Sequence, residues 1–138
     1  MRSFGSLGKA AVALCLFQGV ALADTVKYTV TFEPAKQGGP GSGTATFSLD
    51  TASKTLTGTI EYSGVAPPAM AEFEGPPPKQ GGQPVEVPVP LPASTASPIH
   101  ISMKLTDPVI AGLKSGDWVL LLGTKQAPEI GGDVKPAQ

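Results

Sequence analysis

Hydrophobic and polar residues alternate along most of this chain. Between Thr25 and Glu33, apolar Val26, Tyr28, Val30 and Phe32 are separated by polar residues. A period of two places these apolar side chains on one face of a strand, with the polar side chains on the other. Five further segments show a similar alternation and are predicted as strands: Gly43–Leu49, Thr55–Tyr62, Ala69–Glu74, Val85–Leu91 and Pro98–Leu105.

Turn-forming residues separate these segments. Residues 36–42 read KQGGPGS, 50–54 read DTASK and 75–84 read GPPPKQGGQP. Toward the C-terminus, Trp118–Leu122 is nearly all apolar, as a central strand would be, and Ile130–Val134 predicts a weak closing strand. Seven or eight short strands with turns between them predict an all-β protein, an antiparallel sandwich of two packed sheets.

One short helix is predicted between the last strands, within Leu105–Thr124. Asp107 has a side chain suited to accept hydrogen bonds from the first helical turn, and Pro108 fits the first helical position. Val109, Ile110 and Leu113 fall on one helical face. Gly116 follows, and it favours the left-handed conformation that ends a helix. The Trp118 strand comes next, and its Trp118 and Leu120 are expected in the core.

The segment 66–92 is rich in proline. Within its predicted strand, Pro88 and Pro90 lie on the side opposite to the valines. Proline cannot donate to a ladder, so the segment is expected to be an edge strand or polyproline-like. A rigid, extended surface of this kind binds partners with little loss of entropy, and a protein or envelope partner is one interpretation. A stiff loop that guards a sheet edge is the other.

The first residues are typical of a secretory signal peptide. Arg2 and Lys9 precede a mostly apolar run, and Ala21-Leu22-Ala23 is an A-x-A cleavage signal. We expect residues 1–23 to be removed and residues 24–138 to form a single domain in the periplasm or outside the cell. An uncleaved N-terminal anchor is the alternative, although the apolar run is short for a membrane span. Cys15, the only cysteine, would be lost with the signal, leaving no disulfide.

Charge argues against some classes of partner. Without Arg2 and Lys9, the chain has eight lysines and no arginine beside eleven acidic residues. These charges are scattered, so there is no basic stripe for phosphates, and nucleic acid is not an expected partner. No segment after the signal is long and apolar enough to predict a transmembrane helix.

Three sequence features occur in a specific order. They are GTATFSLDTASKTLTGTIEYSG at Gly43–Gly64, the Glu74-Gly75-Pro76 turn, and the LTD…GDW unit that contains Trp118. In this combination the chain, from about Tyr28 to Val134, resembles the CHRD domain family, named after chordin. Bacterial members of that family are mostly secreted. Its low-level similarity to copper–zinc superoxide dismutases implies an immunoglobulin-like β-sandwich.

The chain departs from this family at the positions that carry histidine. Many CHRD sequences have His-x-His-Gly-Pro at the fourth strand, where this chain has Glu72-Phe73-Glu74-Gly75-Pro76. Gly123-Thr124 stands where family members often have His-Thr. Alternating histidines on a strand suit a soft metal, and their replacement by glutamate argues against an inherited redox metal.

Glu72 and Glu74 are the candidate metal ligands, together with His100. The two glutamates share one strand face and are suited to a hard cation such as calcium, or to acid–base chemistry if one pKa is raised by its neighbour. A solvated strand face is the other interpretation. His100, the only histidine, alternates with Ile99 and Ile101 and is expected to face outward. It completes a ligand set only if its strand lies beside that of the glutamates.

Two hypotheses for function follow. No catalytic triad, cofactor motif or metal cluster is legible in the sequence, so a non-catalytic binding or structural module of the cell envelope is the leading one, with no cofactor. The alternative is a metal-binding protein of dismutase-like ancestry that uses Glu72, Glu74 and His100. Convergence of these three side chains in the fold would favour the second hypothesis.

Overall fold

A computed structural model describes residues 24–35 and 39–137 of the 138-residue chain. The expected signal peptide, residues 1–23, lies outside the described residues. The described part contains one helix and eight strands. In chain order they are β1 (Thr25–Pro34), β2 (Ser42–Asp50), β3 (Thr55–Ser63), β4 (Met70–Gly75), β5 (Val85–Pro88), β6 (Ile99–Lys104), α1 (Asp107–Ser115), β7 (Val119–Gly123) and β8 (Pro128–Pro136).

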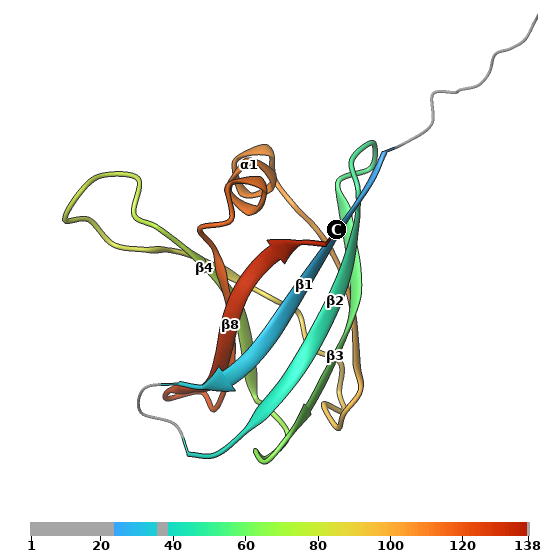
Figure 1. The fold of residues 1–138 in the computed structure, drawn as a ribbon, viewed down its shortest axis with the longest axis vertical. Coiled ribbons are helices and arrows are strands. Elements are labelled where there is room, and N and C mark those ends of the chain that lie inside the picture. The colour runs from blue at the N-terminus through green and yellow to red at the C-terminus, as the bar shows by residue number, and fades with distance from the viewer. Residues whose placement is uncertain (1–23, 36–38, 138) are drawn as a thin grey trace, which may run out of the picture.

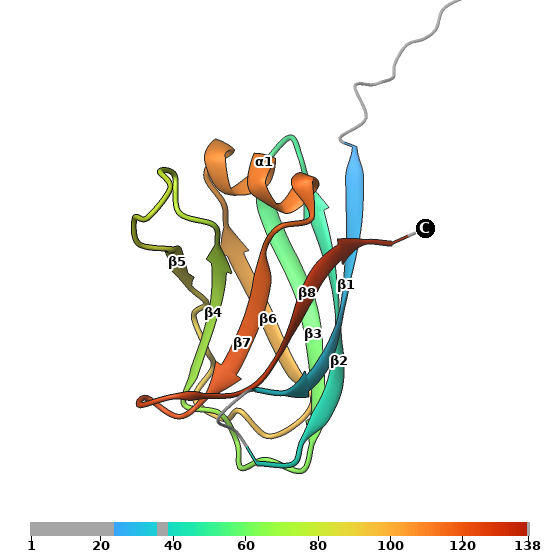
Figure 2. The same ribbon diagram turned by 60° about the vertical axis from the view of Figure 1, so that its left-hand side comes forward.

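The strands form one antiparallel sheet in the order β5-β4-β7-β8-β1-β2-β3-β6. This sheet curls, so that β4, β5 and β7 face β2, β3 and β6 across a common core (Figures 1 and 2). The predicted all-β fold with one short helix is confirmed. The two packed layers of the predicted sandwich are the two halves of this one curled sheet, which is continuous between them.

Strand β8 makes the sheet continuous. Along one edge it pairs with β1 and along the other with β7. The sequence predicts only a weak strand at Ile130–Val134, whereas β8 has nine residues. Proline and glycine lower its intrinsic strand preference, and pairing on both sides compensates for this.

The core contains most of the side chains that the alternation predicts to face inward. Phe47 of β2 and Phe73 of β4 meet edge to face across it, with ring centroids 5.7 Å apart and planes inclined by 63°. This contact joins the two facing halves of the sheet. Trp118 and Leu120 are buried as expected. Most strand bounds agree with the prediction to within one or two residues, but β5 ends at Pro88 rather than at Leu91.

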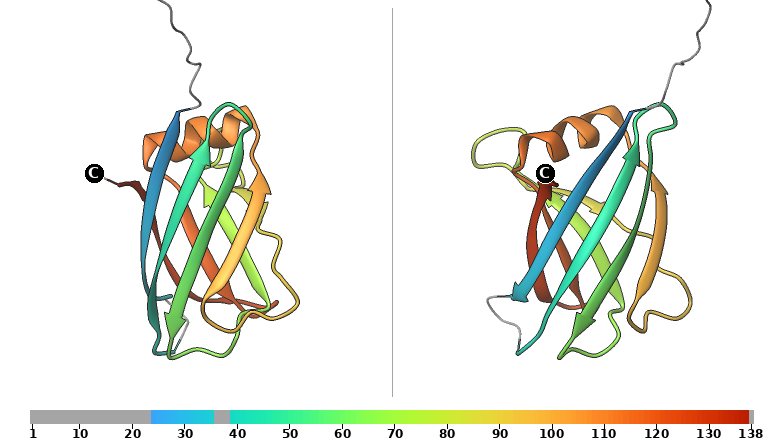
Figure 3. Two further views of the ribbon diagram at one scale, coloured as in Figure 1. Left: turned by 90° about the vertical axis from the view of Figure 1, so that its right-hand side faces the viewer. Right: turned by 45° about the vertical axis from the view of Figure 1, so that its right-hand side comes forward.

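Helix α1 covers one open end of the curled sheet (Figure 3). Its predicted C-terminus is confirmed, because Gly116 is left-handed with φ of 82° and its N–H donates to the Leu113 carbonyl at 3.3 Å. The predicted cap at Asp107 is wrong. Thr106 occupies the N-cap position and makes no side-chain cap hydrogen bond, while Asp107 forms a 2.9 Å ion pair with Lys54.

The indole of Trp118 packs between α1 and β4. A Cβ atom on Gly112 would lie 2.0 Å from the indole Nε1, and one on Gly75 would lie 2.2 Å from its Cε2. No real side chain approaches so closely, so both glycines are needed for the ring to fit. Trp118 therefore ties the helix to the half of the sheet that carries β4.

Candidate functional site

The two candidate glutamates lie on the outward face of β4. Ala71, Phe73 and Gly75 are buried in the core, while Glu72 and Glu74 alternate with them and are half-buried on the other side. Strand geometry accounts for this, because successive side chains point to opposite faces of the sheet. The predicted sharing of one face by Glu72 and Glu74 is confirmed.

Strand β5 adds a third carboxylate to this face. Glu86 lies directly opposite Glu74 in the β4–β5 ladder. One carboxylate oxygen from each of Glu72, Glu74 and Glu86 lies within 4.8 Å of the others. The one ion pair found among the described residues joins Lys54 to Asp107, so no lysine neutralises these carboxylates there. We call Glu72, Glu74 and Glu86 the glutamate cluster.

The cluster changes the acidity of one of its members. The pKa of Glu72 is raised above its ordinary value, first because partial burial disfavours the charged carboxylate. The neighbouring charges of Glu86 and Glu74 raise it further. The carboxylates therefore repel one another, and a bound cation or proton would relieve this repulsion.

His100 does not join the glutamate cluster. It lies on β6, at the opposite edge of the sheet from β5, and five strands separate β6 from β4 in the sheet order. Its Nδ1 is 3.2 Å from the hydroxyl oxygen of Thr59 on β3. A metal site made of Glu72, Glu74 and His100 requires that β4 and β6 lie side by side. They do not, so the structure does not support this ligand set.

The surroundings of His100 are rich in hydroxyl groups. Thr29, Thr46, Thr59 and His100 occupy one row across β1, β2, β3 and β6. A shallow groove of about 580 Å³ lies over this face, which Figure 3 (left) shows with β6 as its last strand. In the described part of the chain, the ring hydrogen-bonds to Thr59 and to no acidic side chain. A hydroxyl–imidazole pair without an orienting carboxylate does not make a catalytic triad.

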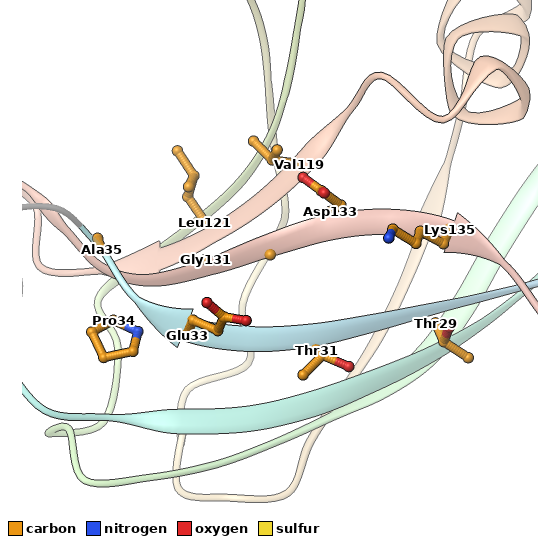
Figure 4. Close-up of a pocket in the computed structure, with 11 residues that line it drawn as sticks. Thr29, Thr31, Glu33, Pro34, Ala35, Val119, Leu121, Gly131, Asp133 and Lys135 are labelled. Carbon is orange, nitrogen blue, oxygen red and sulfur yellow. The ribbon is translucent and has the colours of Figure 1, made fainter.

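A second groove of about 500 Å³ follows β8, where the sheet turns from one half to the other (Figure 4). Val119 and Leu121 form one wall, Thr31 and Glu33 the other, and Gly131 lies between them. This groove adjoins the glutamate cluster, because Val119 is opposite Glu74 and Leu121 is opposite Glu72. Its lining contains no histidine or cysteine, the commonest ligands of transition metals.

The Pro-rich segment 66–92 contains the whole glutamate cluster. It forms the β4–β5 hairpin at the edge of the sheet, and its connection, residues 76–84, extends away from the body of the protein (Figures 1 and 2). Every residue of this connection is exposed except half-buried Pro77. The prediction of an edge strand at Val85–Leu91 is confirmed for Val85–Pro88.

Glu86 is the member of the cluster that the sequence analysis missed. Glu74 and Glu86 lie at equal distance from the two ends of the 76–84 connection. A hairpin closed by that connection pairs them, so treating β4 and β5 as one hairpin would have found the third carboxylate. Three carboxylates offer oxygen ligands of the kind that hard cations prefer.

The fold and these surfaces define an all-β module with a curled antiparallel sheet. A family model for the CHRD domain matches residues 19–134, and the chain belongs to the CHRD domain family. The resemblance inferred from the sequence motifs is thereby confirmed. No curated protein and no solved structure matches the chain. In the part that the structure describes, no helix is long and apolar enough to cross a membrane.

Proposed function

We propose that this protein is an exported, non-catalytic binding module of the cell envelope. CHRD domains are generally non-catalytic modules, which supports the first part of the proposal. The A-x-A signal at Ala21–Ala23 supports export. Removal of the signal would leave a chain that begins at Asp24, directly before β1.

The observation that carries the binding role is the projecting hairpin of the Pro-rich segment 66–92. The 76–84 connection contains four prolines besides its glycines and is exposed almost throughout. Prolines limit the conformations of the free loop, so a partner that binds it loses little entropy on ordering it. The contact surface proposed for a protein or envelope partner is therefore this hairpin.

The binding role is tested by photo-crosslinking in cells. A photoreactive amino acid is placed at Lys79, in the projecting connection, and in a control strain at Ser53, in the exposed turn between β2 and β3. We expect a discrete adduct of higher mass from Lys79 and none from Ser53. Equal labelling at both positions, or none at either, would contradict a contact surface on the hairpin.

Export is tested separately. The intact mass of the protein recovered from the periplasm or the medium should correspond to a chain that begins at Asp24. A chain of full mass that sediments with the membranes would contradict cleavage and support the uncleaved anchor.

A second candidate function, cation binding, is supported by the glutamate cluster. Three carboxylates within 4.8 Å repel one another and offer oxygen ligands for a hard cation such as calcium. The carboxylates in place of histidine favour calcium over copper.

Calorimetric titration with calcium tests this candidate. We expect one calcium per chain in the wild type and loss of binding in Glu86→Gln, which removes one carboxylate without changing the shape of the side chain. Glu61→Gln is the matched control, because Glu61 is an exposed glutamate on the outward side of β3. Absence of heat with the wild type, or an equal loss in both variants, would exclude the cluster as a calcium site.

A further inference from the structure

The two edge strands of the sheet present different backbone groups to solvent. Both backbone groups of a residue in an antiparallel strand point to the same side, and the sides alternate along the strand. The Leu105 N–H donates to the Lys54 carbonyl, so Leu105, Met103 and Ile101 face β3. His100, Ser102 and Lys104 therefore direct their N–H and C=O groups away from the sheet.

At the other edge of the sheet, strand β5 has proline at outward-facing positions, where proline supplies no N–H donor. The Val89 N–H donates to the Ala71 carbonyl, which places Val85, Val87 and Val89 on the side of β4. The outward positions are then Glu86, Pro88 and Pro90, of which only Glu86 retains an N–H. Proline at these positions prevents another strand from pairing with β5.

Strand β6 has no such protection. His100, Ser102 and Lys104 are all exposed, and none of them is proline. Their N–H and C=O groups take no part in the hydrogen bonds between β6 and β3, and no other backbone partner is found for them among the described residues. A row of free donors and acceptors on an edge strand is a template for one further strand.

The sequence of β6 is complementary to itself. If a second copy pairs antiparallel about a two-fold axis at Ser102, the three residues with free backbone groups lie opposite one another, and each pair exchanges two hydrogen bonds. Ile101 then lies opposite Met103 of the second copy on the inner face. Met103 points inward but is only half-buried in the single chain, so the added strand covers an apolar side chain that β6 leaves open.

We propose that the free edge of β6 is a self-association surface, on which a second copy of this chain pairs antiparallel about Ser102. The outward row of such a pair holds His100 opposite Lys104 of the second copy and Ser102 opposite itself, so polar residues meet polar residues. The surface lies at the opposite edge of the sheet from the β4–β5 hairpin, and it is independent of the proposed function.

Disulfide trapping tests the register. The Ser102→Cys variant is made in a Cys15→Ser background, so that it carries a single thiol. Residues paired at the two-fold axis have Cα atoms about 5.5 Å apart, which a disulfide spans. We expect rapid formation of a covalent dimer on mild oxidation. Thr57→Cys is the matched control, because Thr57 is beside Ser102 on β3 and its two copies would be about 15 Å apart.

The alternation of pairs gives a second check. His100→Cys and Lys104→Cys should each form no covalent dimer alone, because neither cysteine faces its own copy, and should crosslink when the two variants are mixed. Crosslinking of Thr57→Cys at the rate of Ser102→Cys, or of His100→Cys with itself, would overturn the proposed register.

Sedimentation of the full chain tests the association without a crosslink. Ser102→Pro installs on β6 the protection that proline gives β5, and it removes no bond to β3 because the Ser102 N–H points outward. We expect it to weaken dimerisation about 100-fold, as both copies lose a central donor, while Ser102→Ala remains dimeric. Circular dichroism confirms that both variants are folded.

A wild-type chain that is monomeric at millimolar concentration would overturn the proposal, as would a dimer that Ser102→Pro leaves intact. A β6 edge occupied by a strand of another protein would give a complex of different mass and would overturn it as well.

Discussion

The two halves of the curled sheet are built differently. Strands β1, β2 and β3 have ten, nine and nine residues, pair over nearly their whole length and carry threonine-rich outward faces. Strands β4, β5 and β7 have only six, four and five residues, and their outward face carries the glutamate cluster. Short ladders and like charges make the second half the weaker one, so its stability depends on side-chain packing.

The largest test of this contrast is Trp118→Ala. Trp118 joins α1 to β4, and its loss should lower the free energy of unfolding by about 3–5 kcal/mol, measured by urea denaturation. Leu121→Ala, on the outward side of β7, is the control and should lower it by about 1 kcal/mol. Equal effects would mean that the second half does not depend on the buried indole.

Gly112→Ala should destabilise the protein, although replacing glycine by alanine in a helix usually stabilises it. Alanine in place of glycine favours an exposed helix by about 1 kcal/mol. Here the added Cβ would lie against the indole Nε1, so we expect a loss of about 1–3 kcal/mol in unfolding free energy. Gly39→Ala, where a Cβ meets nothing within 4 Å, should be nearly neutral.

A double-mutant cycle makes the Gly112 prediction specific. In the Trp118→Ala background the cost of Gly112→Ala should disappear, because the atoms that the new methyl group would contact are gone. A cost that persists without the indole would point to a backbone effect instead.

The long-strand half contains a defect of its own, at Tyr28. Its hydroxyl is buried without a hydrogen-bond partner among the described residues, and burial raises its pKa. Tyr28→Phe should stabilise the protein by about 1 kcal/mol, because an unsatisfied polar group is removed. Tyr62→Phe should destabilise it by about 0.5–1.5 kcal/mol, since the Tyr62 hydroxyl donates to the Thr95 carbonyl. Chemical denaturation of the pair should therefore give shifts of opposite sign.

The smallest expected effect is at the glutamate cluster. Glu86→Gln removes the like charge opposite Glu74 and should stabilise the fold by about 0.2–1 kcal/mol at neutral pH. It should also lower the pKa of Glu72, which carbon-detected NMR titration of the carboxyl group measures. An unchanged Glu72 titration would show that the carboxylates are not coupled.

The direction of the pH effect follows from the raised pKa of Glu72. A carboxyl whose pKa is higher in the folded than in the unfolded protein binds more protons when folded between those two values. Protonation of Glu72 therefore increases the free energy of unfolding as the pH falls through the raised pKa. This stabilisation is lost as the pH rises through the same pKa. In Glu86→Gln this dependence should be weaker, provided that calcium is absent.

Alternation along the chain was enough to predict most of the fold. Tyr28, Val30 and Phe32 face the core as predicted, because period-two burial is a local property of one strand. The role of β8 was not predictable in the same way, since its glycines and prolines hide a strand that two neighbours stabilise. The predicted cap at Asp107 is displaced by one residue, because Thr106 is the N-cap and Asp107 lies in the first helical turn, where its carboxylate pairs with Lys54.

The candidate site was predicted only in part, for a related reason. Glu72 and Glu74 belong to one strand, so their common face could be inferred from spacing alone. Glu86 and His100 depend on which strands are neighbours. The hairpin brings Glu86 to Glu74, whereas the order of strands takes His100 to the far edge.

The pairing of β1 with β8 has a consequence for protein architecture. Tyr28 is paired with Pro136, and the Ala137 N–H donates to the Lys27 carbonyl, so the chain enters and leaves the fold at neighbouring points. A domain with adjacent ends can be inserted into a surface loop of another protein at little entropic cost in loop closure. The fold is therefore well suited to circular permutation and to insertion as a cassette, with the β4–β5 hairpin left free to display a chosen peptide.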